Sequence, residues 1–242
     1  MTFQPNPIDG GQPTDAQHLV VGTRQDAALQ GGYLTHAFFW MFAGLLLSGA
    51  VGVLVRLSPQ VLQLALDNLV LVIIAQFALV LVISFGIRRI SASVALGLFF
   101  VYAASIGFTV IALSLAVYPS ASVIGAFLSA SAMFGGAALY GYTTHRSLAN
   151  LRSFLFMAVI GLFAAMIVNI FLGSSTLDLV ISIGGVVLFT VLTAYHVQRI
   201  ANGDLVVSTG SGEKAAVIGA LLLYLDFVNL FLFLLRLFGG RR

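Results

Sequence analysis

The hydrophobic positions of this chain form long apolar runs that are separated by short polar segments. Seven runs each hold enough apolar residues, roughly 20, to cross about 30 Å of hydrocarbon as an α-helix. The pattern therefore predicts an all-α integral membrane protein with seven transmembrane helices. The runs cover about residues 34–55, 68–87, 91–117, 122–144, 153–172 and 177–195, and the stretch between Lys214 and Arg236.

The first 32 residues have a different character. They are rich in Gly, Pro, Gln and Asp and show no apolar periodicity, so we expect a disordered polar tail. They lack the basic start and short apolar core of a cleavable signal peptide, and we expect the tail to remain in the mature protein. The predicted domains are this tail, residues 1–32, and a seven-helix transmembrane domain, residues 33–242.

Composition agrees with a membrane class. Hydrophobic residues make up 60% of the 242 positions and charged residues only 8%, against about 25% charged in soluble domains. Membrane lipids are therefore the expected covering of most of the surface. The absence of cysteine excludes disulfides, thiolate metal sites and cysteine nucleophiles. The net charge of +3 comes from scattered Lys and Arg, which are typical of topology signals and not of a nucleic-acid surface.

The distribution of Lys and Arg predicts the orientation. With seven spans, seven basic residues fall on the side of the amino terminus and four on the other. Three of those four lie at the carboxyl end of the chain, after the last span. Basic residues favour the cytoplasmic side, so the amino terminus is predicted to be cytoplasmic. The Arg-rich carboxyl end conflicts with this orientation, and a six-span arrangement with a re-entrant final segment would remove the conflict.

One carboxylate falls near the middle of the last span. Asp226 lies twelve residues after Lys214 and ten before Arg236. A charge at that depth costs at least about 2.5 kcal/mol, so it must face the bundle interior with a partner, or become protonated. Asn229, three residues on, shares its helical face. The alternatives are a structural carboxyl in a buried polar contact and a proton or ion site.

Four further polar residues are supporting candidates. Tyr195 and His196 end the sixth span, where an interfacial role is equally open to both. Arg88 and Arg89 follow the second span and suit a positive-inside anchor, or one of them turns inward as a gating counter-charge for Asp226.

Small residues and missing motifs complete the residue-level picture. Gly135, Gly136 and Gly141 have near-helical spacing, which favours close helix packing. The sequence contains no phosphate-binding loop, no HExxH and no paired carboxylates within one segment, and its four histidines are scattered. We therefore expect no enzymatic activity, no cofactor and no resident metal.

Three segments together resemble a known family. They read FGGAALYGYTTHRSL at 134–148, TAYHVQRI at 193–200 and IGALLLYLDFVNLFLFLLRLFGGRR at 218–242. Over residues 33–242 the chain resembles the bacterial branch of the Bax-inhibitor family, the transmembrane Bax inhibitor motif proteins. The resemblance implies a bacterial inner-membrane location and a fold of six helices around a central, carboxyl-terminal seventh.

The resemblance also implies a function and a site. Members of the family are associated with a pH-sensitive calcium leak, so Ca²⁺ or protons are the expected transported ions. The proposed sensor of the family is a pair of aspartates, one in a TAYD-type motif and one in LYLDF. Asp226 matches the second, whereas His196 stands where the first would be. Because Ca²⁺ prefers oxygen ligands, we expect weaker calcium binding here, with proton-linked gating retained or retuned.

A different class of function stays open. A bacterial subgroup of the family is linked to a membrane-bound ATP-dependent protease, and a polar tail is a suitable handle for a partner. The alternative is therefore a non-transporting regulator that binds such a protease or other membrane proteins.

Overall fold

The computed structural model describes the backbone of residues 15–239 and the side chains of residues 32–239. Seven helices in this part of the chain are long and apolar enough to cross a membrane. All seven predicted spans are confirmed, with ends that differ by a few residues. The spans are Gly32–Leu57, Leu69–Gly86, Ala92–Val117, Ser120–Thr143, Ala149–Leu172, Ser175–Ala201 and Gly212–Gly239.

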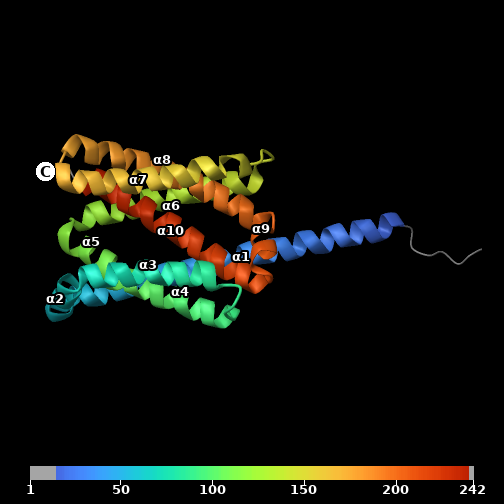
Figure 1. The fold of residues 1–242 in the computed structure, drawn as a ribbon, viewed down its shortest axis with the longest axis horizontal. Helices are drawn as coiled ribbons and strands as arrows, with labels where there is room; N and C mark the ends of the chain where they lie inside the picture. The colour runs from blue at the N-terminus through green and yellow to red at the C-terminus, as the bar shows by residue number, and fades with distance from the viewer. Residues whose placement is uncertain (1–14, 240–242) are drawn as a thin grey trace, which may run out of the picture.

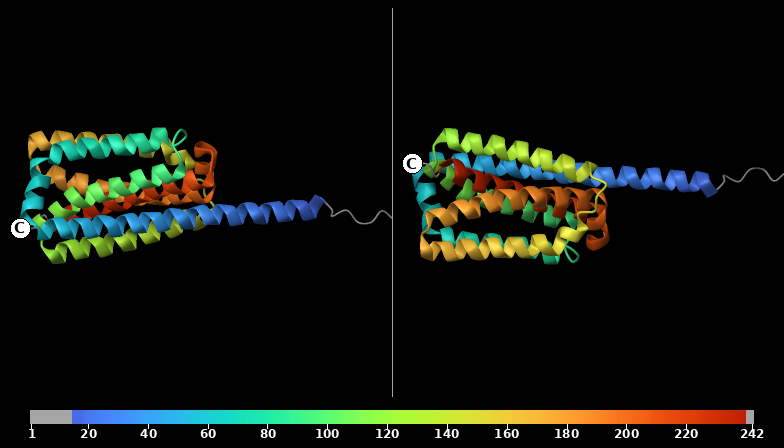
Figure 2. Two further views of the ribbon diagram at one scale, coloured as in Figure 1. Left: turned by 90° about the horizontal axis from the view of Figure 1, so that it is seen from below. Right: turned by 90° about the horizontal axis from the view of Figure 1, so that it is seen from above.

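The first span is the inner part of a longer helix, α1 (Asp15–Leu57). Its amino-terminal part extends beyond the other helices (Figure 2). The disordered tail predicted for residues 1–32 therefore differs from the structure over 15–31, where a rigid span has already nucleated the helix and each added residue costs little. Residues 1–14 lie outside the described part of the chain.

The last helix, α10 (Gly212–Gly239), runs obliquely through the middle of the bundle (Figure 1). On one side lie α1 and α4 (Ala92–Ile106), and on the other α6 (Ser120–Thr143) and α8 (Ser175–Ala201), all four in contact with α10. It is by far the most buried span, at 78%. The central carboxyl-terminal helix is thus confirmed, and its unbroken 28-residue course contradicts a re-entrant final segment.

Two spans lie at the periphery. The helix α3 (Leu69–Gly86) packs chiefly against α4, and α7 (Arg152–Leu172) packs chiefly against α8. Only 11% and 6% of their respective spans are buried, so lipid covers most of their surface. Two short helices connect spans, α2 (Pro59–Asp67) and α9 (Asp204–Thr209), and a third, η2 (Ala149–Leu151), begins the fifth span.

The third span contains a break in its α-helical pattern. A π-helical segment, η1 (Gly107–Ile111), separates α4 from α5 (Ala112–Val117). Such segments leave backbone carbonyls without their usual partner. The side chain of Gln76 on α3 fills this need, since its Nε2 donates to the Ser105 carbonyl and to the Thr109 hydroxyl, both at 2.9 Å. This contact fixes the peripheral helix α3 to α4.

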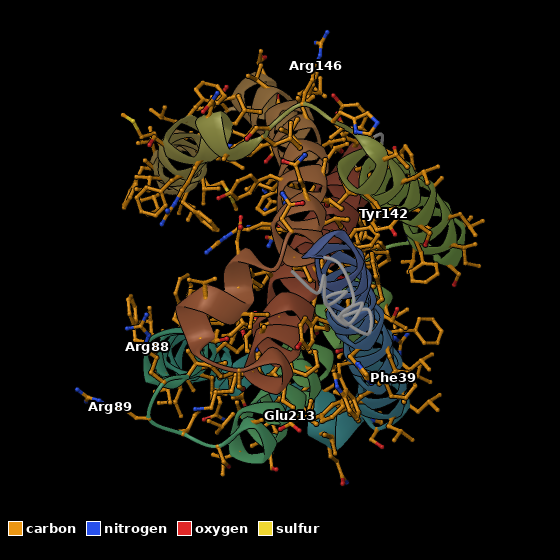
Figure 3. All side chains as sticks on the ribbon, turned by 90° about the vertical axis from the view of Figure 1, so that its right-hand side faces the viewer. Phe39, Arg88, Arg89, Tyr142, Arg146 and Glu213 are labelled. Carbon is orange, nitrogen blue, oxygen red and sulfur yellow. The ribbon has the colours of Figure 1, made fainter. Side chains whose placement is uncertain are left out.

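Basic side chains mark one end of the bundle. Arg88, Arg89 and Arg146 lie at the end from which α1 projects (Figure 3). At the other end Arg236 forms an ion pair with Asp178 at 3.6 Å and lies over the Phe233 ring. Asp178 offsets the charge of Arg236, which was one of the basic residues in conflict with the predicted orientation. A cytoplasmic amino terminus remains the prediction from the positive-inside rule.

The glycine prediction divides into two outcomes. A Cβ on Gly141 would collide with the backbone of Ala194, so α6 and α8 approach closely there, whereas Gly135 and Gly136 have no atom within 4 Å of such a Cβ.

We expect Gly141→Ala to destabilise the protein by about 1–3 kcal/mol, because backbone cannot move aside as a side chain can. Unfolding in detergent measures the change. Gly136→Ala is the matched control, and equal losses in both variants would contradict this packing role.

Candidate functional site

The predicted site residue Asp226 lies at the centre of α10, fourteen residues after Gly212 and thirteen before Gly239. Its neighbours along the helix are almost all Leu, Phe, Val and Tyr, and only 2% of the residue is exposed. A helix that is apolar on every side occupies the core of a bundle, and this placement takes the carboxyl group away from lipid. It must then find its partner within the bundle.

That partner is His196. The Nδ1 atom of His196 and the Oδ2 atom of Asp226 are 2.6 Å apart, and 12% of the histidine side chain is exposed. His196 lies near the end of α8, the helix with which α10 makes its most extensive contact. The sequence placed both residues on a list of candidates, and the structure brings them into direct hydrogen-bonding contact.

The hydrogen bond can exist in more than one protonation state. In one form the imidazole N–H donates to the carboxylate, and in another the carboxyl O–H donates to the bare imidazole nitrogen. A neutral imidazole beside an ionised carboxylate has a net charge of −1. One added proton brings the pair to zero net charge, either as an imidazolium–carboxylate ion pair or as a neutral imidazole and carboxylic acid. Loss of that proton makes the pair negative, and gain of another makes it positive. The pair therefore converts proton uptake into a change of charge inside the bundle.

The pair faces a cavity of about 790 Å³ between α3, α4, α7, α8 and α10. The two supporting residues Tyr195 and Asn229 also line it. The Tyr195 ring lies 5.3 Å from the His196 ring, and the Asn229 amide donates to the Leu225 carbonyl at 2.8 Å. On α7 the lining residues run from Arg152 to Phe163, which are eleven positions apart, a distance of about 17 Å along a helix. On α7 the cavity thus extends from one end of the bundle to about half-way along the span, and on α3 it extends as far as Ile73.

The other two supporting candidates lie elsewhere. The Arg88 Nε atom donates to the Ser208 carbonyl of α9 at 2.9 Å, and Arg89 points away from the bundle (Figure 3). Neither lines the cavity that contains Asp226. The structure therefore places them as surface residues of the loop end, consistent with the anchor interpretation, and does not bring either one to Asp226.

Three lining residues were missed in the sequence. Gln76 interrupts a run of otherwise apolar residues on α3 and could have been found by the same rule that singled out Asp226. Arg152 and Arg199 were counted only as topology signals, yet both line the cavity. Arg199 lies three residues after His196, hence on the same helical face, and that spacing was the available signal.

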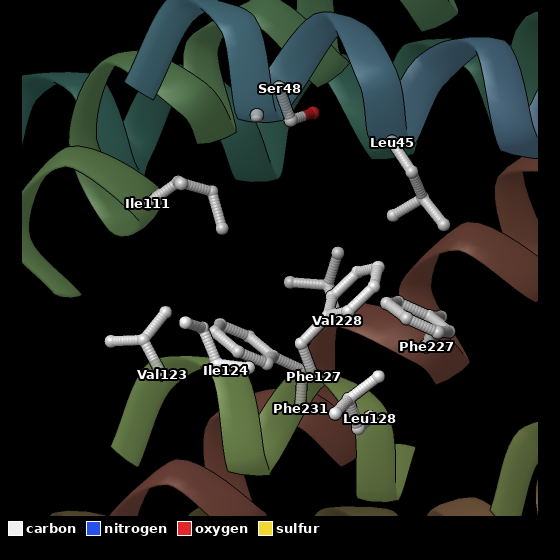
Figure 4. Close-up of a pocket in the computed structure, with 11 residues that line it drawn as sticks. Leu45, Ser48, Ile111, Val123, Ile124, Phe127, Leu128, Phe227, Val228 and Phe231 are labelled. Carbon is white, nitrogen blue, oxygen red and sulfur yellow. The ribbon is translucent and has the colours of Figure 1, made fainter. Parts of the chain in front are cut away.

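A second hollow, of about 250 Å³, lies between α1 and α6 over α10 (Figure 4). Its only polar lining residue is Ser48, whose hydroxyl contacts the Gly44 and Ala103 carbonyls and the Tyr224 hydroxyl within 2.8 Å. Since this hydroxyl already has its partners, the hollow offers a ligand only apolar contact. Within residues 32–239, no three His, Cys, Asp or Glu side chains come together as a metal site.

The buried pair predicts a strongly non-additive stability effect. His196→Leu leaves the Asp226 carboxyl without its partner, and breaking a buried pair in this way costs about 3–5 kcal/mol. Replacing both residues by leucine removes the need for a partner, so we expect the double variant to lose much less than the sum of the single losses. Denaturation in detergent of the four proteins of this cycle measures the coupling.

The control for this cycle is Asp178→Asn. It breaks an ion pair whose side chains are 49% and 38% exposed, and such pairs contribute about 0–1 kcal/mol. Strictly additive losses for His196→Leu and Asp226→Leu would contradict a coupled pair.

Comparisons with known proteins agree with this architecture. The family model described as "Inhibitor of apoptosis-promoting Bax1" matches residues 30–242. The chain is 42% identical to "Inner membrane protein YbhL" of Escherichia coli K12 over 87% of this chain and 92% of that protein. It is 42% identical to an uncharacterised protein of Deinococcus radiodurans, over 86% and 90% of the two chains. An uncharacterised protein of Borreliella burgdorferi is 37% identical over 90% and 96%.

Proposed function

The chain belongs to the Bax inhibitor family, and we propose that it is a pH-sensitive cation leak protein of the bacterial inner membrane. The observation that carries the proposal is the 2.6 Å contact between His196 and Asp226 at a cavity that reaches mid-membrane. An ionisable pair at that depth is costly and is typical of ion and proton pathways. The similarity to an inner membrane protein of Escherichia coli supports the inner-membrane location.

The cavity provides the access half of the pathway. A cation or proton enters at the end where Arg152 and Arg199 lie and reaches the pair. Toward the other end of the bundle the space between α8 and α10 is filled: Phe233 of α10 lies against Gly185 and stacks with Phe189 of α8 at 5.8 Å. Passage therefore requires α8 and α10 to separate in that half. The charge of the His196–Asp226 pair, which changes with protonation, controls that separation and the energy of a cation beside it.

Protons and calcium are the proposed ions. A proton can bind either to the carboxylate or to the imidazole of the pair. Calcium prefers oxygen ligands and several carboxylates, and this site offers one carboxylate with the Asn229 and Tyr195 side chains nearby. Calcium therefore binds weakly and passes as a transported ion, not as a resident cofactor.

Neutralising the carboxylate tests the pathway. Asp226→Asn removes a charge that is worth about 4 kcal/mol to a cation 4 Å away at an effective dielectric of 20, against about 1.4 kcal/mol for a tenfold effect. We expect proton and calcium flux into proteoliposomes to fall by at least about tenfold. Asp178→Asn, an isosteric change at the other end of the bundle, is the control and should keep its flux. Unchanged flux in Asp226→Asn would contradict the proposal.

Restoring a second carboxylate tests the role of the histidine. His196→Asp offers two acidic groups in place of one, so we expect faster calcium flux and a changed pH dependence. Flux is measured with calcium- and proton-sensitive dyes trapped in the same vesicles over a range of pH. Equal flux and equal pH dependence in His196→Asp and the unaltered protein would show that the pair does not set either property.

A further inference from the structure

The cavity holds two cationic side chains that the ion pathway does not use. Arg152 is the first residue of α7 and Arg199 is close to the end of α8. Because α7 and α8 pack as consecutive antiparallel helices, both arginines lie at the same end of the cavity. Among the described residues neither guanidinium has an ion pair or a hydrogen bond.

Charge in the cavity is unbalanced. Its lining contains one carboxylate, Asp226, and that group already contacts His196. The other acidic residues of the described chain lie outside the cavity, and Asp178 contacts Arg236 at the opposite end. Two guanidinium groups therefore face this space without an acidic partner, which favours an anionic ligand.

The walls beyond the arginines are apolar and reach the lipid. Phe77 of α3 and Phe156 of α7 line the cavity, and they are 62% and 67% exposed. The cavity thus opens sideways between two peripheral helices, α3 and α7, which pack mainly on other neighbours. A volume of about 790 Å³ lies in the range of pockets that enclose a ligand, about 300–1,000 Å³.

We propose that this cavity is a binding site for an anionic phospholipid of the surrounding bilayer. The phosphate group contacts Arg152 and Arg199 at the loop end, and one acyl chain enters between α3 and α7 along the apolar wall. Arginine binds phosphate oxygens through two parallel N–H donors, and basic pockets between transmembrane helices suit acidic headgroups. This inference concerns lipid binding and holds whether or not the protein conducts ions.

The headgroup is tested by comparing two double variants that each remove two cations. Arg152→Gln with Arg199→Gln alters the cavity, whereas Arg89→Gln with Arg146→Gln alters exposed arginines at the same end of the bundle (Figure 3). Native mass spectrometry of the full chain, titrated with dioleoylphosphatidylglycerol, measures binding. We expect about a tenfold loss for the cavity variant, from the loss of charge-assisted hydrogen bonds, and a change within about twofold for the surface variant.

The acyl chain is tested independently on α7, without any change of charge. Val159 lines the cavity and its neighbour Ile160 does not. Val159→Trp should fill the chain position and lower phosphatidylglycerol binding, whereas Ile160→Trp on the lipid-facing side should leave it unchanged. This arm remains decisive if the arginine variant does not fold.

Four results would overturn the proposal. Equal losses in the two arginine variants would mean that diffuse surface charge alone attracts the lipid. Unchanged binding in Val159→Trp would exclude a chain in the cavity. Displacement of phosphatidylglycerol by glycerol phosphate at equal concentration would show a polar anion site that gains nothing from an acyl chain. Binding of dioleoylphosphatidylcholine as tight as that of phosphatidylglycerol would likewise contradict it.

Discussion

The hydrogen bond between His196 and Asp226 gives the buried Asp226 carboxyl the polar partner that it needs. A carboxyl group at the centre of the innermost helix is 2% exposed and cannot face lipid, so its position requires a polar partner on a neighbouring helix. This requirement fixes the relative rotation of α8 and α10. The two helices also pack extensively. Small residues such as Gly185 allow aromatic side chains of α10 to lie against α8.

Around this central contact the bundle has a tightly packed part and a loosely held part. The helices α1, α4, α6 and α8 enclose α10, and buried polar contacts such as Ser48 with Tyr224 link them. In contrast, α3 packs chiefly against one neighbour, α4, to which the contact of Gln76 with the π-helical segment holds it. The helix α7 likewise packs chiefly against α8. The cavity lies where the loosely held helices α3 and α7 flank the packed centre. A space that must admit ions or lipid is thus bordered by the helices that can move at least cost.

Much of this architecture could be predicted from the sequence because the bilayer imposes simple rules. Length and hydropathy gave all seven spans, and the cost of a buried charge identified Asp226 before any partner was known. The family resemblance put His196 at the position of the other member of the sensor pair, but the contact itself needed three-dimensional information, since two residues thirty positions apart carry no local signal of it. The same limit explains why Arg88 and Arg89 were overestimated and Arg152 and Arg199 overlooked: all four are basic residues at span ends, and only the fold decides which of them face the cavity.

The division of the glycines follows the same logic. Gly135, Gly136 and Gly141 share one helix and one composition, yet only Gly141 meets the backbone of α8. Helical spacing can place residues on a face, but which face meets a neighbour depends on the rotation of α6, which is set by contacts elsewhere in the bundle.

A histidine at position 196, where the family resemblance implies an aspartate, changes the charge of the site at every step of protonation. Two aspartates would pass through net charges of 0, −1 and −2 as protons leave, whereas a histidine and an aspartate pass through +1, 0 and −1. At equal proton occupancy the site in this protein is therefore one unit more positive. Such a site is less attractive to a divalent cation, and its fully deprotonated form carries the charge that a half-protonated aspartate pair would have. With two further guanidinium groups at the cavity entrance, the electrostatics of this end favour anions, while only the depth of the cavity, at Asp226, offers a cation a favourable contact.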